Sequence, residues 1–412
     1  MTNVANQIAT EARRARREKL NALPDGIYLN LSHLDYLLID RISNSKCKKL
    51  HMSAGDYWQD SDMNPDCEEQ NPAESNAYVL GRAYHSAVLE PEKFALEYCC
   101  KLDKADFMDP NTGKPFKGAC FTGTDIGAAL KDMGQPASVA GEKVEEKAQR
   151  LADCGHKGPI WHLKLAEYEE WRGDRSEIGA KYWDQLIKDV EYIFSLEEIR
   201  PFITGGLSEV TILYTGKDGT RCKTRLDKLY ADKIVDFKSF DNARQKPLRQ
   251  CMLDAIRYNS LYMQTVKYWL SCRHIVWDDL QIMDAAEGQT EAQEIIDTIK
   301  SREGGLPFFF VFKQKSGVPN CVARELRLWN TDNAFVDGID YHTALASAEK
   351  RGAKSGIFMK GMIEVNRALG IYNRSMEIFG RDEPWRETNM VDHFNDSDFN
   401  GNWLDEDVTA NG

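Results

Sequence analysis

The residues with the clearest chemical potential stand together in Asp236-Phe237-Lys238. The apolar residues around this triplet predict a β-strand over 234–238, in which successive side chains point to opposite faces. Asp236 and Lys238 would then share one face, while Val235 and Phe237 point into the core. The sequence therefore predicts a carboxylate and an amine side by side on a strand.

A second acid, Asp227, lies in a strand predicted for residues 220–230. If the turn between the strands is the two-residue Ala231-Asp232, Asp227 lies opposite Asp236, and a four-residue loop gives the same pairing. Cross-strand neighbours have Cβ atoms about 5 Å apart. Two bare carboxylates at that distance would repel each other unless a cation lay between them.

A hard divalent ion such as Mg²⁺ would suit this pair, because it prefers oxygen ligands and also accepts water and phosphate oxygens. Lys238 could orient and help deprotonate an attacking water, while the ion stabilises the charge that develops on phosphorus. Asp-x-Lys alone is weak support, since surface strands often alternate acid and base. Asp227 could instead be an exposed partner of Lys228 or Arg225, and Glu209 a surface acid at a strand end.

The surrounding pattern alternates helices and strands, which predicts an α/β (α+β) fold. Val210, Ile212 and Tyr214 alternate with polar residues as in a half-buried strand, followed by a turn at 217–219. A helix is predicted over Asn76–Leu89, where Pro91 stops it. Further helices are predicted over 5–22, 141–154, 177–196, 248–270 and 333–350, strands over 307–312 and 321–329, and a long loop over 43–76.

Four segments in this order resemble the PD-(D/E)XK nuclease superfamily, in particular the branch of RecE (exonuclease VIII), λ exonuclease and the RecB-type nuclease domains. They are Gly81-Arg-Ala-Tyr-His85, Ser208-Glu209, Arg225-Leu-Asp227 with Ile234-Val-Asp236-Phe-Lys238, and Gln264-x-x-x-Tyr268. The resemblance covers about residues 30–300. It implies a restriction-endonuclease-like core in which a central mixed sheet is flanked by helices.

The resemblance also implies roles for these residues. His85, Asp227, Asp236 and the carbonyl of Phe237 would hold Mg²⁺, for which Mn²⁺ would substitute, and Lys238 would be catalytic together with the two acids. By itself, a helical histidine is more often an ordinary surface or core residue.

Three further residues would support this site. Glu209 is expected among the catalytic carboxylates, in a supporting position. Gln264 and Tyr268 would line the DNA side, and their i, i+4 spacing puts both on one helical face.

The activity implied is a metal-dependent exonuclease that degrades linear double-stranded DNA from an end, 5′ to 3′, in phage-type recombination or repair. A ring-shaped homo-oligomer and a single-strand annealing protein as partner are implied with it. The alternatives are an endonuclease or single-strand nuclease of the same fold, and an inactive DNA-binding or assembly module. Intact His85, Asp227, Asp236 and Lys238 argue against the inactive module.

The domain organisation predicted from composition has three parts. Residues 1–75 form an N-terminal helical and loop region, 76–375 the nuclease domain with a loop-rich insert near 101–175, and 381–412 an acidic, disordered tail. The chain has 412 residues and a net charge of −12. The tail, with nine acidic and two basic residues, supplies much of that charge, so the body is only mildly acidic.

Other features bound the setting. The 10 cysteines lack metal-cluster spacing, so no iron–sulfur cluster is expected. No apolar run is long enough to span a membrane. The resemblance implies a bacterial or phage-infected cytoplasm. The basic stretch from Arg13 to Lys19 is a solvated helix face or a phosphate-binding arm. The acidic tail is a solubilising end or, with Trp403 and Leu404, a docking peptide for a partner.

Overall fold

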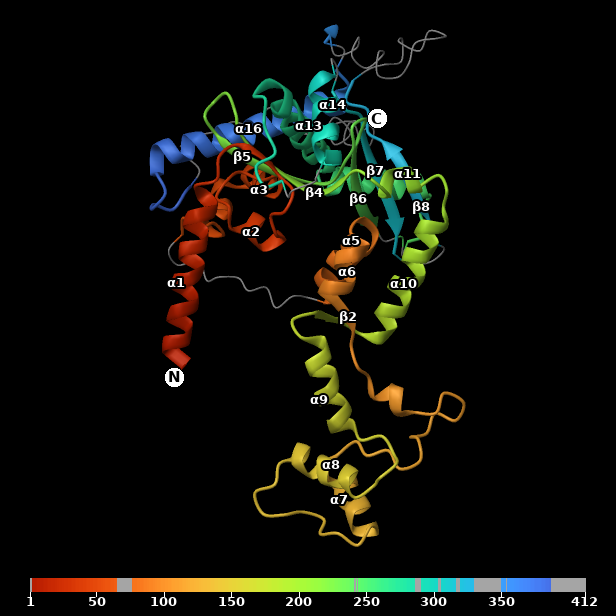
Figure 1. Cartoon of the computed structure of the whole chain (residues 1–412). Coiled ribbons are helices and arrows are strands. Elements are labelled where there is room, and N and C mark those ends of the chain that lie inside the picture. Colours follow the sequence, from red (N-terminus) through yellow and green to blue (C-terminus); the bar gives the residue numbers. More distant parts are fainter. Residues whose placement is uncertain are drawn as a thin grey trace, which may run out of the picture.

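The computed structural model describes residues 2–64, 76–240, 242, 244–285, 290–302, 305–315, 319–329, 350–352 and 354–386. Its centre is a six-stranded mixed sheet with the strand order β1-β4-β5-β6-β7-β8, flanked by helices (Figure 1). The strands are β1 (Gly26–Tyr28), β4 (Leu207–Thr215), β5 (Arg221–Leu229), β6 (Ile234–Phe240), β7 (Phe308–Gln314) and β8 (Cys321–Glu325).

The middle of the sheet follows from two kinds of connection. Strands β4, β5 and β6 are consecutive antiparallel neighbours joined by tight turns, whereas β6 and β7 are parallel. A parallel neighbour requires a crossover. The crossover contains α12 (Leu248–Tyr258), α13 (Leu261–Trp277) and α14 (Thr290–Ser301).

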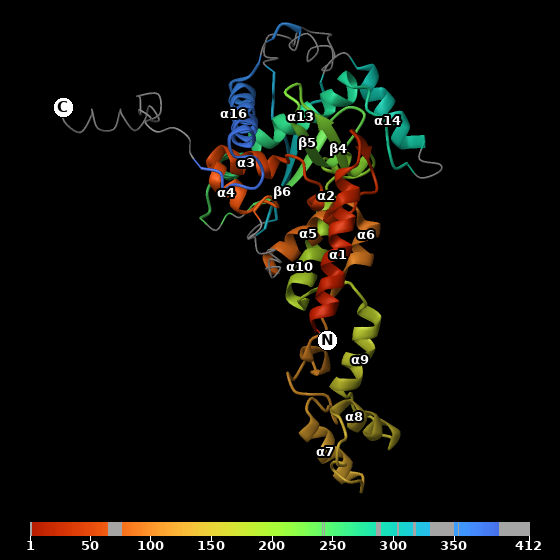
Figure 2. The same cartoon turned by 90° about the vertical axis from the view of Figure 1, so that its left-hand side faces the viewer.

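Helices cover both faces of the sheet (Figures 1 and 2). On one face α13 packs with α16 (Gly356–Phe379) and α3 (Asn44–Met52) around Val266, Phe310 and Phe358. On the other face α5 (Asn76–Leu89) and α10 (Ala180–Ser195) contribute to a core with Val235, Phe237 and Val311. Strand β6 is therefore buried on both sides, and any polar group on it must find a partner inside the protein.

A helical lobe projects from the α5 side of the body (Figures 1 and 2). It contains η1 (Lys104–Phe107), α7 (Gly123–Asp132), α8 (Val144–Asp153) and α9 (Trp161–Arg172). The loop-rich description of residues 101–175 is thus corrected. Ile126, Leu130 and Leu151 are fully buried in a small core of the lobe's own, which explains why short, polar helices are stable there.

The chain enters and leaves the lobe through a small parallel sheet. Its strands are β2 (Tyr98–Cys100), which follows α6 (Pro91–Glu97), and β3 (Ser176–Ile178), which precedes α10. Tyr98 and Ile178 pack with residues of α5, among them Ala83 and Ala87. The base of the lobe is therefore fixed to the helix that carries His85.

The N-terminal region belongs to the same body, which corrects a boundary at residue 75. β1 pairs with β4 in the central sheet, and α1 (Thr2–Asn21) and α2 (His33–Leu38) flank it. Two helices, α3 and α4 (Ala54–Gln59), occupy the first part of the loop predicted over 43–76, and residues 65–75 of that loop lie outside the described residues. Ser43 and Ser53 cap them by accepting hydrogen bonds from backbone N–H groups.

Two other predictions need revision. The helix expected over 248–270 is broken at Asn259–Ser260, where Ser260 adopts a left-handed conformation, φ 46°. Residues 381–386 are not a free tail, because Trp385 is buried and stacks on Tyr57. The rest of the predicted tail, 387–412, and most of the predicted helix 333–350 lie outside the described residues.

None of the helices in the described part of the chain combines the length and the apolarity that crossing a membrane requires.

Candidate active site

The β5–β6 hairpin opens where the two acids lie. The backbone N–H of Tyr230 donates to the carbonyl of Lys233 across the two-residue turn (3.0 Å), as predicted. The ladder contains Leu229 opposite Ile234 and Lys228 opposite Val235, in the predicted register, and ends before the position of Asp227.

Beyond that point a side chain, and not the backbone of β5, accepts a hydrogen bond from β6. The Asp227 Oδ2 atom accepts a hydrogen bond from the backbone N–H of Phe237 at 2.8 Å. A buried backbone donor needs such a partner once its strand neighbour has moved away. The opening of the hairpin thus directs the Asp227 carboxylate toward the next strand.

Asp236 and Lys238 lie on the face of β6 opposite Phe237. The Asp236 side chain is fully buried, and its Oδ2 lies 2.6 Å from the Lys238 Nζ atom, which itself lies 4.0 Å from Asp227 Oδ2. One ammonium group therefore bridges two carboxylates, and the acid–amine pair predicted from sequence is present.

Glu209 lies across from Asp227 on β4. The β4–β5 register runs from Ser208–Lys228 to Val210–Leu226, and Glu209, between them, has a left-handed φ of 53°. A non-glycine residue in this conformation is uncommon and redirects the side chain. Glu209 forms an ion pair with Arg225. It is thus a half-buried, partnered acid next to Asp227.

His85 reaches the site from α5. Its ring packs edge-on against Phe237, with 5.4 Å between the ring centroids, and its Nδ1 lies 3.6 Å from Asp227 Oδ2. His85, Glu209 and Asp227 each offer a ligand atom within 4.8 Å of the others. The histidine, remote in sequence, therefore meets the acids as predicted.

Gln264 and Tyr268 approach from α13. The Gln264 Nε2 group donates to Asp236 Oδ1 at 2.8 Å and lies 2.9 Å from the Tyr268 hydroxyl, which it also contacts as a donor. Both side chains are buried. Gln264 therefore holds Asp236 in place from the helix side. Tyr268 also borders a large cavity, which Gln264 does not.

Burial disfavours charge on the two aspartates. Burial, and then the charge of Asp227, raises the pKa of Asp236 to about 7. Burial, opposed by Lys238, raises the pKa of Asp227 to about 6. Although burial opposes it, the two carboxylates raise the pKa of Lys238. Burial, and then Lys238, lower the pKa of His85, so its imidazole is neutral at pH 7.

These residues line one large cavity. Its volume is about 1240 Å³, and His85, Glu209, Asp227 and Lys238 all border it. A typical small-molecule site has about 300–1,000 Å³, so this cavity is large enough for a segment of a polymer. Perturbed carboxylates in a cleft of this kind are typical of a functional site.

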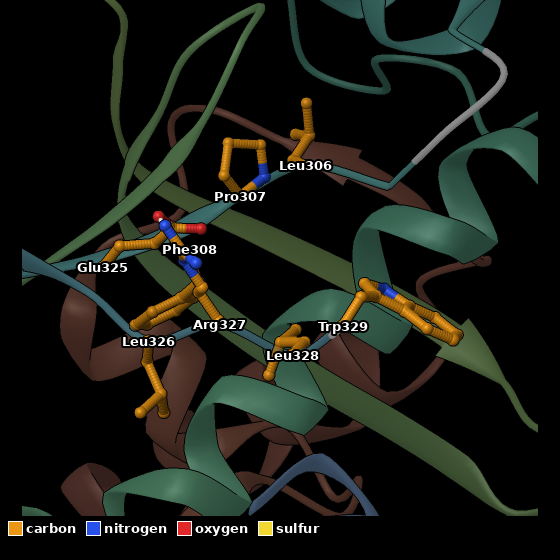
Figure 3. Close-up of a pocket in the computed structure, with 8 residues that line it drawn as sticks. All are labelled: Leu306, Pro307, Phe308, Glu325, Leu326, Arg327, Leu328 and Trp329. Atoms are coloured by element: carbon orange, nitrogen blue, oxygen red, sulfur yellow. Dashed lines mark ion pairs between the residues drawn. The ribbon is translucent and has the colours of Figure 1, made fainter. Parts of the chain in front are cut away.

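A second pocket has none of these residues in its lining. It is formed where β7 begins and β8 ends, between Leu306 and Trp329 (Figure 3). Its volume of about 10 Å³ accommodates a single water molecule at most. Glu325 and Arg327 are the charged residues in its lining, and it offers no room for a substrate.

The donor set fits a hard divalent cation. Carboxylates of Asp227 and Glu209 and a neutral His85 imidazole are within reach of one ion, and oxygen and imidazole ligands suit Mg²⁺ or Mn²⁺. The raised pKa values of the aspartates show that their negative charge is poorly compensated, and a bound cation would compensate it. Asp236 and the Phe237 carbonyl adjoin this group, although the Phe237 carbonyl lies 3.4 Å from Lys238 Nζ.

Sequence reasoning missed one contributor, Arg225. It holds Glu209 and also donates to the carbonyl of Leu31 at 2.9 Å and to Thr211 Oγ1 at 3.3 Å. Arg225 lies two residues before Asp227, so the sequence predicts both side chains on the same face of the strand. Its partner on β4, Glu209, could not be predicted from the sequence. Arg225 ties the acids to the N-terminal segment.

Comparisons with known proteins add little to this geometry. No protein-family model matches the chain, and no curated protein matches it. A search of solved structures finds a crystal structure described as "Putative exonuclease" from Eubacterium rectale, with 14% sequence identity and a TM-score of 0.27. The match covers 66% of this chain and 88% of that one.

Proposed function

We propose that this chain is a divalent-metal-dependent nuclease that hydrolyses phosphodiester bonds in DNA. One observation carries the proposal: the open β5–β6 hairpin brings Asp227, Asp236 and Lys238 together, with His85 beside them, and Asp227, Lys238 and His85 border a cavity of about 1240 Å³. Buried, repelling carboxylates next to a lysine are costly to the fold. Such an arrangement is retained where it serves chemistry.

The side chains divide the work of hydrolysis. Lys238, held by two carboxylates, is placed to orient a water molecule and to stabilise negative charge that develops on a phosphate oxygen. Asp236, anchored by Gln264, fixes the lysine. A divalent ion bound by Asp227 and its neighbours would supply electrostatic stabilisation of the phosphorane-like transition state.

The finer proposal is an exonuclease that degrades linear duplex DNA from an end, 5′ to 3′, with Mg²⁺ as cofactor. It rests on the resemblance of the His85, Asp227–Lys238 and Gln264-x-x-x-Tyr268 segments to the RecE and λ exonuclease branch. A ring-shaped homo-oligomer, a single-strand annealing partner and a role in phage-type recombination belong to the same proposal, as does a cytoplasmic setting.

The test is incubation of the purified chain with linear and with covalently closed circular duplex DNA, with Mg²⁺ or with EDTA. We expect the linear DNA to be degraded from its ends in Mg²⁺ only, and the circle to persist. Cleavage of the circle, which has no ends, would show that the activity is that of an endonuclease and not of an exonuclease. If neither DNA is cleaved with Mg²⁺ or Mn²⁺, the proposal is wrong. Light scattering under the same conditions tests the ring, because a monomer cannot encircle DNA.

A further inference from the structure

We propose that Arg172, at the base of the helical lobe, binds a backbone phosphate of the nucleic acid that occupies the cavity. This inference rests on the proposed function and assigns the lobe a part in it. Arg172 is the last residue of α9 and lies on the cavity wall together with Asp227 and Lys238.

The other cations of the cavity wall are already engaged. Among the described residues, the wall contains six lysine and arginine residues: Arg82, Lys93, Arg172, Arg175, Arg225 and Lys238. Lys93 pairs with Glu90, Arg225 with Glu209, and Lys238 with Asp236. Arg82 also has a partner.

Arg175 is committed to local structure. Its Nε donates to the carbonyl of Arg172 at 3.0 Å, and its guanidinium lies 3.8 Å from the centre of the Trp171 ring. A cation at this place satisfies the last carbonyls of α9 and complements the helix dipole. Arg175 therefore closes the helix and leaves the neighbouring guanidinium of Arg172 available.

Arg172 itself has no ion pair or hydrogen bond from its side chain within the described residues. Its Nε atom is buried and unpartnered. Asp174, two positions along, also lines the cavity, but the two form no ion pair. A partly buried guanidinium without an acceptor is unfavourable in the empty protein. An anion in the cavity would satisfy it.

The position of Arg172 is fixed relative to the acids. After Arg172 the chain enters β3, which pairs with β2 and packs through Ile178 against α5. His85 lies on α5, so the guanidinium and the metal-binding group share one rigid support. In a cavity that also holds the hydrolytic side chains, the anion best matched to a guanidinium is another phosphate of the same polymer, which accepts a bidentate pair.

The test measures binding of a fluorescently labelled DNA oligonucleotide, duplex and single-stranded in separate arms, at a series of salt concentrations in EDTA. We expect Arg172→Met to weaken binding about tenfold. The slope of log affinity against log salt should become shallower by about 0.7 for the single strand or about 0.9 for the duplex, which is one phosphate contact. Arg172→Lys should restore most of the slope.

Two controls separate a binding role from a structural one. Lys164→Met removes a charge from the same helix but outside the cavity wall, where Lys164 pairs with Glu167; its slope should equal that of the wild type. Metal-dependent hydrolysis of bis(p-nitrophenyl) phosphate, which carries one phosphate and so offers Arg172 no second phosphate to bind, should be unchanged in Arg172→Met.

The outcomes are distinct. If the wild type cleaves DNA but Arg172→Met keeps the wild-type slope, Arg172 makes no phosphate contact and only this inference is overturned. The same holds if Lys164→Met changes the slope equally, or if Arg172→Met melts early and loses both activities. If the wild type neither binds nor cleaves DNA, the proposed function fails and the inference fails with it.

Discussion

Two buried lysine–aspartate pairs lie on adjacent strands of the same sheet, and they differ in what surrounds them. On β6, Lys238 pairs with Asp236 and lies 4.0 Å from a second carboxylate, Asp227. On β7, Lys313 pairs with Asp189 of α10. Lys238 borders the large cavity and its side chain is 24% exposed, whereas the side chain of Lys313 is 2% exposed and does not border it.

The second pair is a closed network. Asp189 also accepts hydrogen bonds from the Tyr84 hydroxyl and from Gln185, at 3.0 Å in the latter case. The Lys313 ammonium lies 4.3 Å from the centre of the Tyr84 ring. Since Tyr84 precedes His85 on α5, this network holds the helix that presents the histidine. The Lys313–Asp189 pair, whose hydrogen bonds are all made inside the protein, stabilises the structure. The Lys238–Asp236 pair borders a cavity and has a second carboxylate nearby, so it is available for chemistry.

The largest difference should come from removing each lysine. Lys238→Met should lower nuclease activity about 100- to 10,000-fold, with a small change in melting temperature, because the raised pKa values let the aspartates take up protons. Lys313→Met should leave the activity of the folded protein near that of the wild type. Linear-DNA degradation and thermal melting of both variants measure this, and the reverse pattern would show that the two pairs have been assigned the wrong roles.

Lys313→Met should instead destabilise the fold by about 3 kcal/mol, because Asp189 would remain buried without its counter-ion. The double variant Lys313→Met with Asp189→Leu should regain part of this loss, since both charges are then absent. Urea unfolding of Lys313→Met, Asp189→Leu and the double variant checks the expectation. Additive losses in the double variant would mean that the two residues do not act as a pair.

The comparison also explains what could be predicted from the sequence. Lys238 and Asp236 are one strand period apart, so their proximity follows from local geometry. Asp189 and Lys313 are 124 positions apart, and no local pattern joins them. His85 was placed at the site by its motif alone, because the packing of α5 on β6 depends on the whole fold. Glu209 was likewise placed by its motif alone, and its left-handed φ of 53° has no sequence signature. Its ion pair with Arg225 could not be predicted for the same reason.

Element types were largely predictable, and element ends were not. The helix Asn76–Leu89 and the strands from 207 to 240 agree with the structure. In the lobe, α7 was not predicted, although Thr122 and Asp125 form a capping box at its start. The lobe's helices are short and bury few side chains. Their stability comes from the lobe's own core, so the propensity of each segment alone was insufficient.

A smaller effect is expected for Gln264, which anchors Asp236 without bordering the cavity. Gln264→Leu keeps the volume but removes the donor to Asp236 Oδ1, so the carboxylate can rotate away from Lys238. Residues that orient ligands in this way are typically worth about 10- to 100-fold in metal affinity or activity. Tyr268→Phe is the matched control, because it leaves the Gln264–Asp236 hydrogen bond intact and should cost less. If the two variants lose equally, the role of Gln264 is to support packing and not to position the acid.

The smallest effect is the dependence of metal affinity on pH. Metal ligands must be deprotonated. Burial raises the pKa of Asp227 to about 6, and burial together with the charge of Asp227 raises the pKa of Asp236 to about 7. The protonated fraction of these acids therefore falls as the pH rises from 6 to 8, and Mn²⁺ should bind about tenfold more tightly at pH 8 than at pH 6, with protons released on binding. Calorimetry in buffers of different ionisation enthalpy measures both quantities. Lys313→Met should show the same pH dependence, because Asp189 lies outside the group of ligands. An affinity that is constant over this range would place the ion away from the aspartates, and the contrast between the two lysine–aspartate pairs would then have to be explained without a metal.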